Sequence, residues 1–215
     1  PKYRFKDSEE LQKYFYKRKE PEVFINSSIQ GDISSFIYKF FSDMPGEIII
    51  DADKICGHVF DLLGSGPVKV YYGMRAKGFE GYCYDTQIKD KDSAIAYHYE
   101  PIDWHIDFKS GYRWDPKQYC GDIKYGHKSG ADIKFPWELS RFQHLTTLGE
   151  AYQLTKDEKY AFEFVHQVTD WIECNPPKFG VNWKCTMDVA IRTCNWLLAW
   201  EFFKNSLSIS SEFII

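Results

Sequence analysis

The sequence has no long apolar run, no block of like charges and no closely spaced pair of cysteines. A membrane-spanning helix needs about 18 apolar residues, and the longest candidates, 47–50 and the patch from Trp196 to Phe203, are much shorter. The 27 basic and 31 acidic residues leave a net charge of −4 without any run of five or six of one sign. These absences exclude a membrane span and argue against nucleic acid as a partner.

Metal and disulfide chemistry also find little support. The six cysteines form no C-x-x-C pair and no Cys/His cluster at zinc spacing, and they stand at Cys56, Cys83, Cys120, Cys174, Cys185 and Cys194. We expect free, mostly buried thiols, with no metal and no cofactor.

Aromatic residues, in contrast, are abundant, because 17 Phe, 15 Tyr and 7 Trp make up 18% of the chain. With 44% apolar and 27% charged residues, the composition is that of a globular protein. The rings either fill a core or line a groove where sugars stack on them.

The first 130 residues combine two helices with a long irregular stretch. Polar caps followed by apolar periodicity predict helices over 8–16 and 33–41, the second of which ends at Pro45-Gly46. From Glu47 to Gly130 glycines and prolines multiply among short apolar runs, which predicts loops with brief strands.

Three helices are predicted after Asp132. The first runs from about Pro136 to Leu154, and the second carries an apolar stripe from Tyr160 to Ile172. The third, near Cys185 to Lys204, is apolar almost all round and is expected to be buried on every side. Short turns joining amphipathic and apolar helices predict a mainly α fold, an incomplete α/α toroid of helical hairpins behind an irregular N-terminal segment.

Three helices cannot close such a ring, and 210–215 resembles a cap opening another helix. We therefore expect a truncated fold with two segments: 1–130, holding the N-terminal helices and the loop region, and 131–215, holding the first toroid helices.

Charged and aromatic side chains meet on the first of these helices. Trp137, Glu138 and Arg141 lie within two turns, and Glu138 and Arg141 are three residues apart on one face. This spacing suits either a carboxylate-recognising, ring-stacking patch at a helix mouth or an ordinary ion pair beside a packed indole.

Two further pieces place polar groups near the third helix. Asn182 and Trp183 precede it, where they either reach the mouth of a cavity or cap and pack the loop. Asp188 and Arg192 are four residues apart on the apolar helix itself. Because unpaired buried charge is costly, they must pair with each other or with a polar neighbour.

The segment 102–108 alternates polar and apolar residues and predicts an extended strand or loop that presents Asp103, His105 and Asp107 to one side. His105 is either a proton-transfer group near neutral pH or a hydrogen-bonding strut. The glycines around His58 match neither phosphate-loop spacing, so that reading is rejected.

Together these pieces resemble the N-terminal region of the heparinase II/III-like polysaccharide lyases. The resemblance rests on a combination of segments over about 55–205, namely 60–66, 102–108, 137–141, 175–176, 180–183 and 188–192.

The resemblance implies an incomplete α/α toroid followed, in complete members, by an antiparallel β-sandwich, and β-elimination of uronic-acid polysaccharides. In that chemistry Asn, His or Arg neutralises the uronate, and Tyr or His moves the protons. The family's Asn-His-type motif does not follow Asn182 in this sequence, so no catalytic residue is assigned and this chain alone is expected to be inactive. The resemblance also favours a periplasmic or secreted location.

We therefore expect an acidic polysaccharide as partner, with the toroid remainder and β-sandwich supplied by a longer chain. The predicted substrate-binding residues are Trp104, His105, Asp107, Trp137, Glu138, Arg141, Asn182, Trp183 and Arg192. Two alternatives stay open: a non-catalytic module for acidic-polysaccharide binding or exopolysaccharide assembly, and an α/α-barrel glycoside hydrolase using Glu138 with Asp107.

Overall fold

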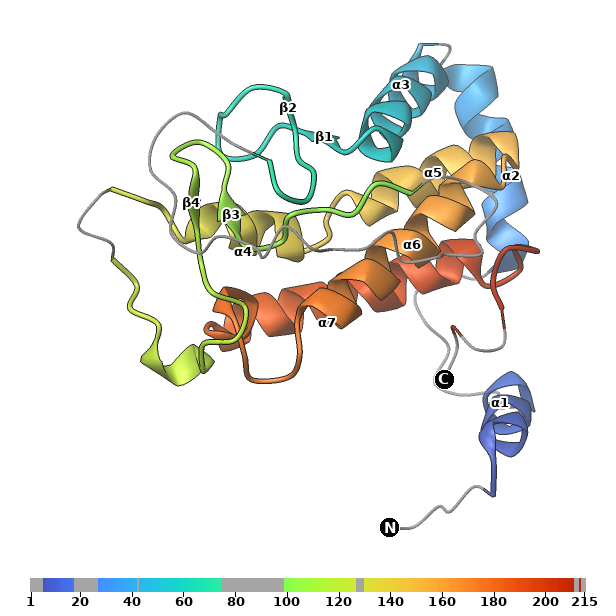
Figure 1. Cartoon of the computed structure of the whole chain (residues 1–215). Helices are drawn as coiled ribbons and strands as arrows, with labels where there is room; N and C mark the ends of the chain where they lie inside the picture. The colour runs from blue at the N-terminus through green and yellow to red at the C-terminus, as the bar shows by residue number, and fades with distance from the viewer. Residues whose placement is uncertain are drawn as a thin grey trace.

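The computed structural model describes residues 6–17, 27–41, 43–74, 99–126, 130–210 and 213. Helices dominate this part of the chain (Figure 1). The α-helices are α1 (Ser8–Lys17), α2 (Ser27–Phe40), α3 (Met44–Cys56), α4 (Lys134–Ser140), α5 (Leu145–Thr155), α6 (Lys159–Cys174) and α7 (Thr186–Phe203). Two 3₁₀ turns, η1 (Cys120–Asp122) and η2 (Val181–Trp183), and four two-residue strands complete it. The prediction of a mainly α fold is confirmed.

Helix α5 lies at the centre of the packing. It contacts α3, α6 and α7, and in Figure 1 it lies between α3 on one side and α6 and α7 on the other. Their buried side chains form one apolar core that extends from Ala52 on α3 to Phe203 on α7. Residues from both expected segments, 1–130 and 131–215, contribute to this core. None of the described helices is long and apolar enough to cross a membrane.

The prediction of one continuous helix over 136–154 is wrong. It breaks into α4 and α5 because Phe142 adopts a left-handed conformation, with φ of 60°. That conformation costs about 1–2 kcal/mol for a residue with a side chain. The Phe142 ring is fully buried, in contact with Trp104 and Trp196, and burial of such a ring contributes about 1.5–3 kcal/mol. Burial of the ring therefore offsets the strained turn.

Helix α3 was not predicted. Pro45 and Gly46 begin this helix instead of ending the preceding one, since proline is tolerated in a first helical turn. The β-branched run Ile48–Ile50 obscured the helical spacing of the residues that face the core, Ala52 and Ile55. The rest of the irregular stretch, where described, is loop with brief strands as expected.

The prediction that helix α7 is buried on every side is wrong. Its buried positions are largely charged, with Asp188, Arg192 and Glu201 beside Ala199 and Phe203. The opposite side exposes Met187 at 57% and Leu197 at 59%. Ala190 and Cys194 are also exposed and complete a stripe at helical spacing.

The four strands form two antiparallel hairpin pairs. β1 (Val59–Phe60) pairs with β2 (Val68–Lys69), and β3 (Ile106–Asp107) pairs with β4 (Tyr112–Arg113). The second pair and η2 pack against α4 around a smaller apolar cluster, whose buried members are Trp114, Ile123, Ala131, Ile133, Trp137 and Val181.

The described cysteines are free thiols. The expectation that they are mostly buried is wrong, because Cys56, Cys120, Cys174 and Cys185 are only half-buried and Cys194 is exposed. Cys83 lies outside the described residues, as do 211, 212, 214 and 215 of the segment expected to open another helix.

Candidate functional site

The segment 102–108 is buried along its whole length. Trp104 is 0% exposed, and its indole Nε1 donates to Asp170 Oδ2 on α6 at 2.8 Å. The same oxygen accepts the backbone N–H of Ile102 at 3.0 Å and the Tyr99 hydroxyl at 3.2 Å. Asp170 therefore anchors this segment to α6, and the Trp104 ring leaves no open face on which a sugar could stack.

His105 occupies a structural position. Its Nε2 lies 3.1 Å from the carbonyl oxygen of Cys174, at the end of α6. Burial lowers the pKa of His105 to about 4, so the ring is neutral near pH 7 and donates its Nε2 proton to that carbonyl. Gly180, with φ of 77°, packs so closely on the ring that an added Cβ would lie 2.8 Å from Cε1. These contacts are those of the strut alternative.

The two aspartates of this segment serve the turns around them and do not face outward to one side. Asp103 Oδ2 accepts Arg113 Nε at 2.6 Å, with both side chains buried. Asp107 accepts the backbone N–H groups of Lys109 and Asp132 at 2.9 Å and the Ser110 hydroxyl at 2.6 Å. Because Asp107 is 1% exposed with both oxygens engaged, it does not reach a substrate beside Glu138.

Arg141 joins two helices through two carboxylates. It pairs with Glu138 one turn back on α4 and, through Nε, with Asp188 Oδ1 on α7 at 2.6 Å. The side chains of Arg141 and Glu138 are 17% and 18% exposed, whereas that of Asp188 is 1% exposed. Asp188 therefore has the polar neighbour that its burial requires, and the neighbour is Arg141, in direct contact although 47 residues away in sequence.

Arg192 is buried among backbone carbonyls and rings. Its guanidinium donates to the carbonyl oxygens of Ser140 at 3.2 Å and Asn182 at 3.3 Å. The same group lies 4.0 Å from the centroid of Trp171 and 5.4 Å from that of Trp183, within cation–π range. Burial lowers the pKa of Arg192 to about 10. The polar neighbours that the buried Arg192 requires are therefore the carbonyl oxygens of Ser140 and Asn182, and not Asp188.

Asn182 and Trp183 fix the loop before α7. The Asn182 amide donates to the carbonyl of Trp104 at 2.8 Å and to the side chain of Asn175 at 2.9 Å. The Trp183 indole is half-buried and donates to the Asn175 carbonyl at 3.0 Å. Asn182 is 1% exposed, so Trp183 is the member of this pair with surface available to a ligand.

An exposed group of rings and lysines lies next to these residues, and we call it the ring–lysine face. It consists of Tyr119, Lys124, Tyr125, Phe179 and Lys184. Tyr125 is 60% exposed; its ring lies 5.7 Å from that of Trp137, whose indole donates to the Val181 carbonyl at 2.9 Å. Lys184 Nζ lies 5.3 Å from the Tyr125 ring. Tyr119 and Phe179 are also exposed and pack edge to face.

The ring–lysine face carries positive charge on an acidic chain. Residues 115–126 and 176–184, which form it, contain four lysines and two aspartates, a net charge of +2 against −4 for the whole chain. Sequence reasoning selected tryptophans and missed these tyrosines. The available signal was the concentration of lysine beside Tyr and Phe in two Gly- and Pro-containing loops, where side chains project to solvent.

Comparison with known proteins gives a family match and partial relatives. The family model described as heparinase II/III N-terminus matches residues 70–215. A heparin-sulfate lyase of Bacteroides thetaiotaomicron is 27% identical over 134 residues, which cover 60% of this chain and 19% of that protein. A heparin-sulfate lyase of Bacteroides stercoris is 40% identical over 58 residues, covering 27% of this chain and 9% of the relative.

A third heparin-sulfate lyase, from Pedobacter heparinus, is 31% identical over 85 residues, or 40% of this chain and 12% of its own length. The chain thus aligns with between 9% and 19% of the length of these relatives. No solved structure matches the chain.

Proposed function

The chain belongs to the heparinase II/III family, whose N-terminal region matches residues 70–215, and from that premise we propose that it is the N-terminal part of a polysaccharide lyase. The proposed reaction is β-elimination of a polysaccharide that contains uronic acid. The names of the relatives, all heparin-sulfate lyases, support a sulfated uronic-acid polymer as the substrate class.

We further propose that α5, α6 and α7 are the first helices of an α/α toroid. The exposed stripe on α7, formed by Met187, Ala190, Cys194 and Leu197, supports this arrangement because a contiguous apolar helix face normally packs against a partner. In this proposal a following helix of the toroid covers that stripe.

The proton-transfer groups of the reaction are assigned to other parts of a longer protein. β-Elimination needs a cation or donor that neutralises the uronate, a base that removes the C5 proton and an acid that protonates O4. The His105 ring is neutral, 1% exposed and engaged with Cys174, so it does not supply the base. In this proposal the 215-residue chain alone binds the polysaccharide without cleaving it.

The ring–lysine face is the proposed contact surface for the polysaccharide, and its juxtaposition of exposed rings with lysines carries the proposal. Tyr119, Tyr125 and Phe179 offer faces for sugar C–H groups. The exposed Lys124 and the half-buried Lys184, whose Nζ also donates to the Gly121 carbonyl oxygen at 2.9 Å, offer donors to carboxylate or sulfate. Of the residues selected from sequence, Glu138, Arg141 and Trp183 keep partial exposure beside this face. They are proposed to form its inner edge.

Calorimetric titration with heparan sulfate oligosaccharides tests this surface. Tyr125→Ala should weaken binding about two- to tenfold, the value of one lost ring contact, and Lys184→Gln should reduce both affinity and its salt dependence. The matched controls are Tyr71→Ala and Lys54→Gln, an exposed tyrosine and lysine away from the face, which should leave affinity unchanged. Equal effects of the face and control variants would refute the assignment.

A further inference from the structure

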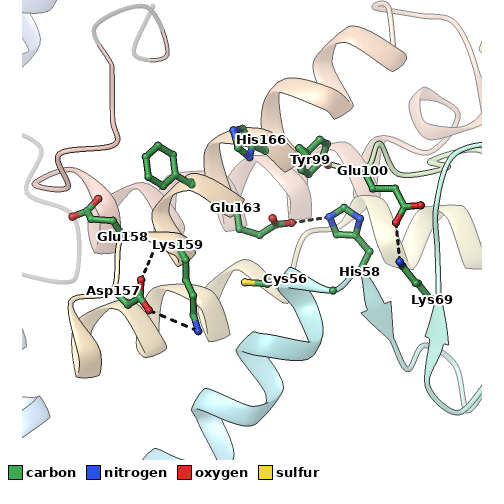
Figure 2. Close-up of a pocket in the computed structure, with 12 residues that line it drawn as sticks. Cys56, His58, Lys69, Tyr99, Glu100, Asp157, Glu158, Lys159, Glu163 and His166 are labelled. Atoms are coloured by element: carbon green, nitrogen blue, oxygen red, sulfur yellow. Dashed lines mark hydrogen bonds and ion pairs between the residues drawn. The ribbon is translucent and has the colours of Figure 1, made fainter. Parts of the chain in front are cut away.

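A separate pocket of about 440 Å³ opens where the end of α3, strands β1 and β2, and the start of α6 meet (Figure 2). None of the residues discussed above for polysaccharide binding lines it. Its lining is unusually rich in titratable groups, which are Cys56, His58, Lys69, Tyr99, Glu100, Asp157, Glu158, Lys159, Glu163 and His166, together with Phe162. The volume falls in the range of small-molecule sites.

The charge of this pocket is negative. Two lysines oppose four carboxylates, so these six side chains together carry a charge of −2. Lys69 is engaged with Glu100 at 2.8 Å and Lys159 with Asp53 at 2.8 Å. Glu158 is held by hydroxyl groups of Ser206 and Ser208 and has no cationic partner among the described residues. A uronate or sulfate would be repelled here, and a cation attracted.

His58 and Glu163 form the inner wall. His58 is 2% exposed, adopts a left-handed conformation with φ of 55°, and places Nε2 2.9 Å from Glu163 Oε1. The left-handed turn at the end of α3 directs the imidazole across to α6, as Figure 2 shows.

A chain of hydrogen bonds fixes the direction of this pair. His144 Nε2 lies 2.7 Å from Gln167 Oε1, and the Gln167 amide donates to Glu163 Oε1 at 2.6 Å. Glu163 accepts the Nε2 proton of His58, which leaves the lone pair of a neutral His58 ring on Nδ1. That nitrogen has no hydrogen-bond partner within the described part of the chain, and in Figure 2 it lies on the side of the ring away from Glu163.

Rings form the remaining wall. The His166 ring stacks on Phe162 with the centroids 6.2 Å apart and the planes inclined by 27°, and its centroid lies 5.1 Å from that of Tyr99. Burial lowers the pKa of His166, so this ring is neutral near pH 7 and adds no positive charge. Burial raises the pKa of the Cys56 thiol to about 12, so this thiol is protonated near pH 7.

We propose that this pocket binds a small ligand that carries a protonated primary amine on a ring of monosaccharide size, that is, an amino sugar. The ammonium group would meet the His58 Nδ1 acceptor and the carboxylates, and the ring would lie against Phe162 and His166. The site is independent of the proposed polysaccharide surface, which has the opposite charge.

Three probes of equal ring size test the proposal: glucosamine, N-acetylglucosamine and glucuronate. Glucosamine should bind with a dissociation constant of about 1 mM or tighter and should shift the ring resonances of His58 and His166 in a proton–carbon NMR titration. The other two probes should bind at least about tenfold more weakly, because one lacks the positive charge and the other reverses it. Absence of glucosamine binding, or equal binding of N-acetylglucosamine, overturns the proposal.

Variants at the exposed rim separate charge from folding. Glu100→Gln should weaken glucosamine binding about two- to fivefold, and Lys69→Gln should strengthen it by a similar factor, since each changes one partly exposed charge. Glu150→Gln, the same substitution outside the pocket, should change nothing. Glu163→Gln should lower affinity about tenfold or more. If Glu163→Gln fails to fold, the opposite signs expected of the two rim variants still decide, and equal signs overturn the proposal.

Discussion

Replacement of Arg141 by methionine tests the most consequential contact in the structure, the link between α4 and α7. Methionine retains much of the apolar stem but removes the guanidinium that pairs with Asp188 at 2.6 Å. The Asp188 side chain is 1% exposed, and its second oxygen has no hydrogen-bond partner among the described residues. Arg141→Met therefore leaves a buried carboxylate without its cation.

The expected cost follows from that burial. Removal of one partner from a fully buried pair costs about 3–5 kcal/mol. Because Arg141 is 17% exposed, water can partly solvate the site, and we expect a loss of about 2–4 kcal/mol in the free energy of unfolding. Asp188→Asn should cost less, about 1–2 kcal/mol, since Arg141 retains Glu138 and its access to water.

Urea denaturation of the two single variants and the double variant measures this directly, with a coupling energy of about 1–3 kcal/mol expected from the cycle. Glu138→Gln is the matched control and should cost less than about 1 kcal/mol, as for a surface pair. If Arg141→Met costs no more than Glu138→Gln, the interhelical ion pair is not the main role of Arg141. Binding losses in Arg141 variants must be measured at temperatures where the variants remain folded.

Two further predictions concern packing and pH. Gly149→Ala should destabilise the fold by about 1–3 kcal/mol despite the better helix propensity of alanine, because its Cβ would lie 2.6 Å from the Phe202 ring. Gly46→Ala, whose Cβ would have nothing within 4 Å, should be neutral or stabilising. Thermal melts of both variants compare them, and equal effects would contradict the packing of α5 against α7. The pKa of His105 is about 4 in the folded chain, against 6.5 for an exposed histidine, so the unfolded chain takes up a proton first as the pH falls. The free energy of unfolding should therefore be insensitive to His105 above pH 6.5 and fall by up to about 1.4 kcal/mol per pH unit below it. Urea denaturation between pH 7 and pH 5 should give a shallower dependence of stability on pH for His105→Gln. An unchanged dependence would refute the burial of His105 as a neutral ring.

Periodicity predicted the elements that have a single apolar side. The stripe from Tyr160 to Ile172 is α6, and the mainly α fold follows from such stripes. Periodicity failed where one backbone angle decides whether a helix continues, because nothing in the spacing around Phe142 indicates a left-handed residue inside an otherwise continuous apolar pattern. It also failed at α3, where three consecutive isoleucines carry both helical and strand character.

The candidate site was predicted less well, for a different physical reason. Trp104 and Asp107 lie in an alternating segment, and alternation does not distinguish a strand at a cavity from one buried on both sides. The partner that buries Trp104 is Asp170, 66 residues away, and the partner of Asp188 is 47 residues away. Such distant pairings are set by packing, so local spacing could assign Arg141 only to its neighbour Glu138.

The most direct test of the central account combines binding and turnover on the same sample. The purified 215-residue chain is titrated calorimetrically with heparan sulfate, alginate and hyaluronan, and each mixture is then followed for the ultraviolet absorbance of the unsaturated uronate that β-elimination produces. The account predicts binding to heparan sulfate that weakens with added salt, with no rise in absorbance for any of the three polymers. Turnover by this chain alone would contradict the assignment of the proton-transfer groups to other parts of the protein, and absence of binding to all three polymers would contradict its role as the polysaccharide-binding N-terminal region of a lyase.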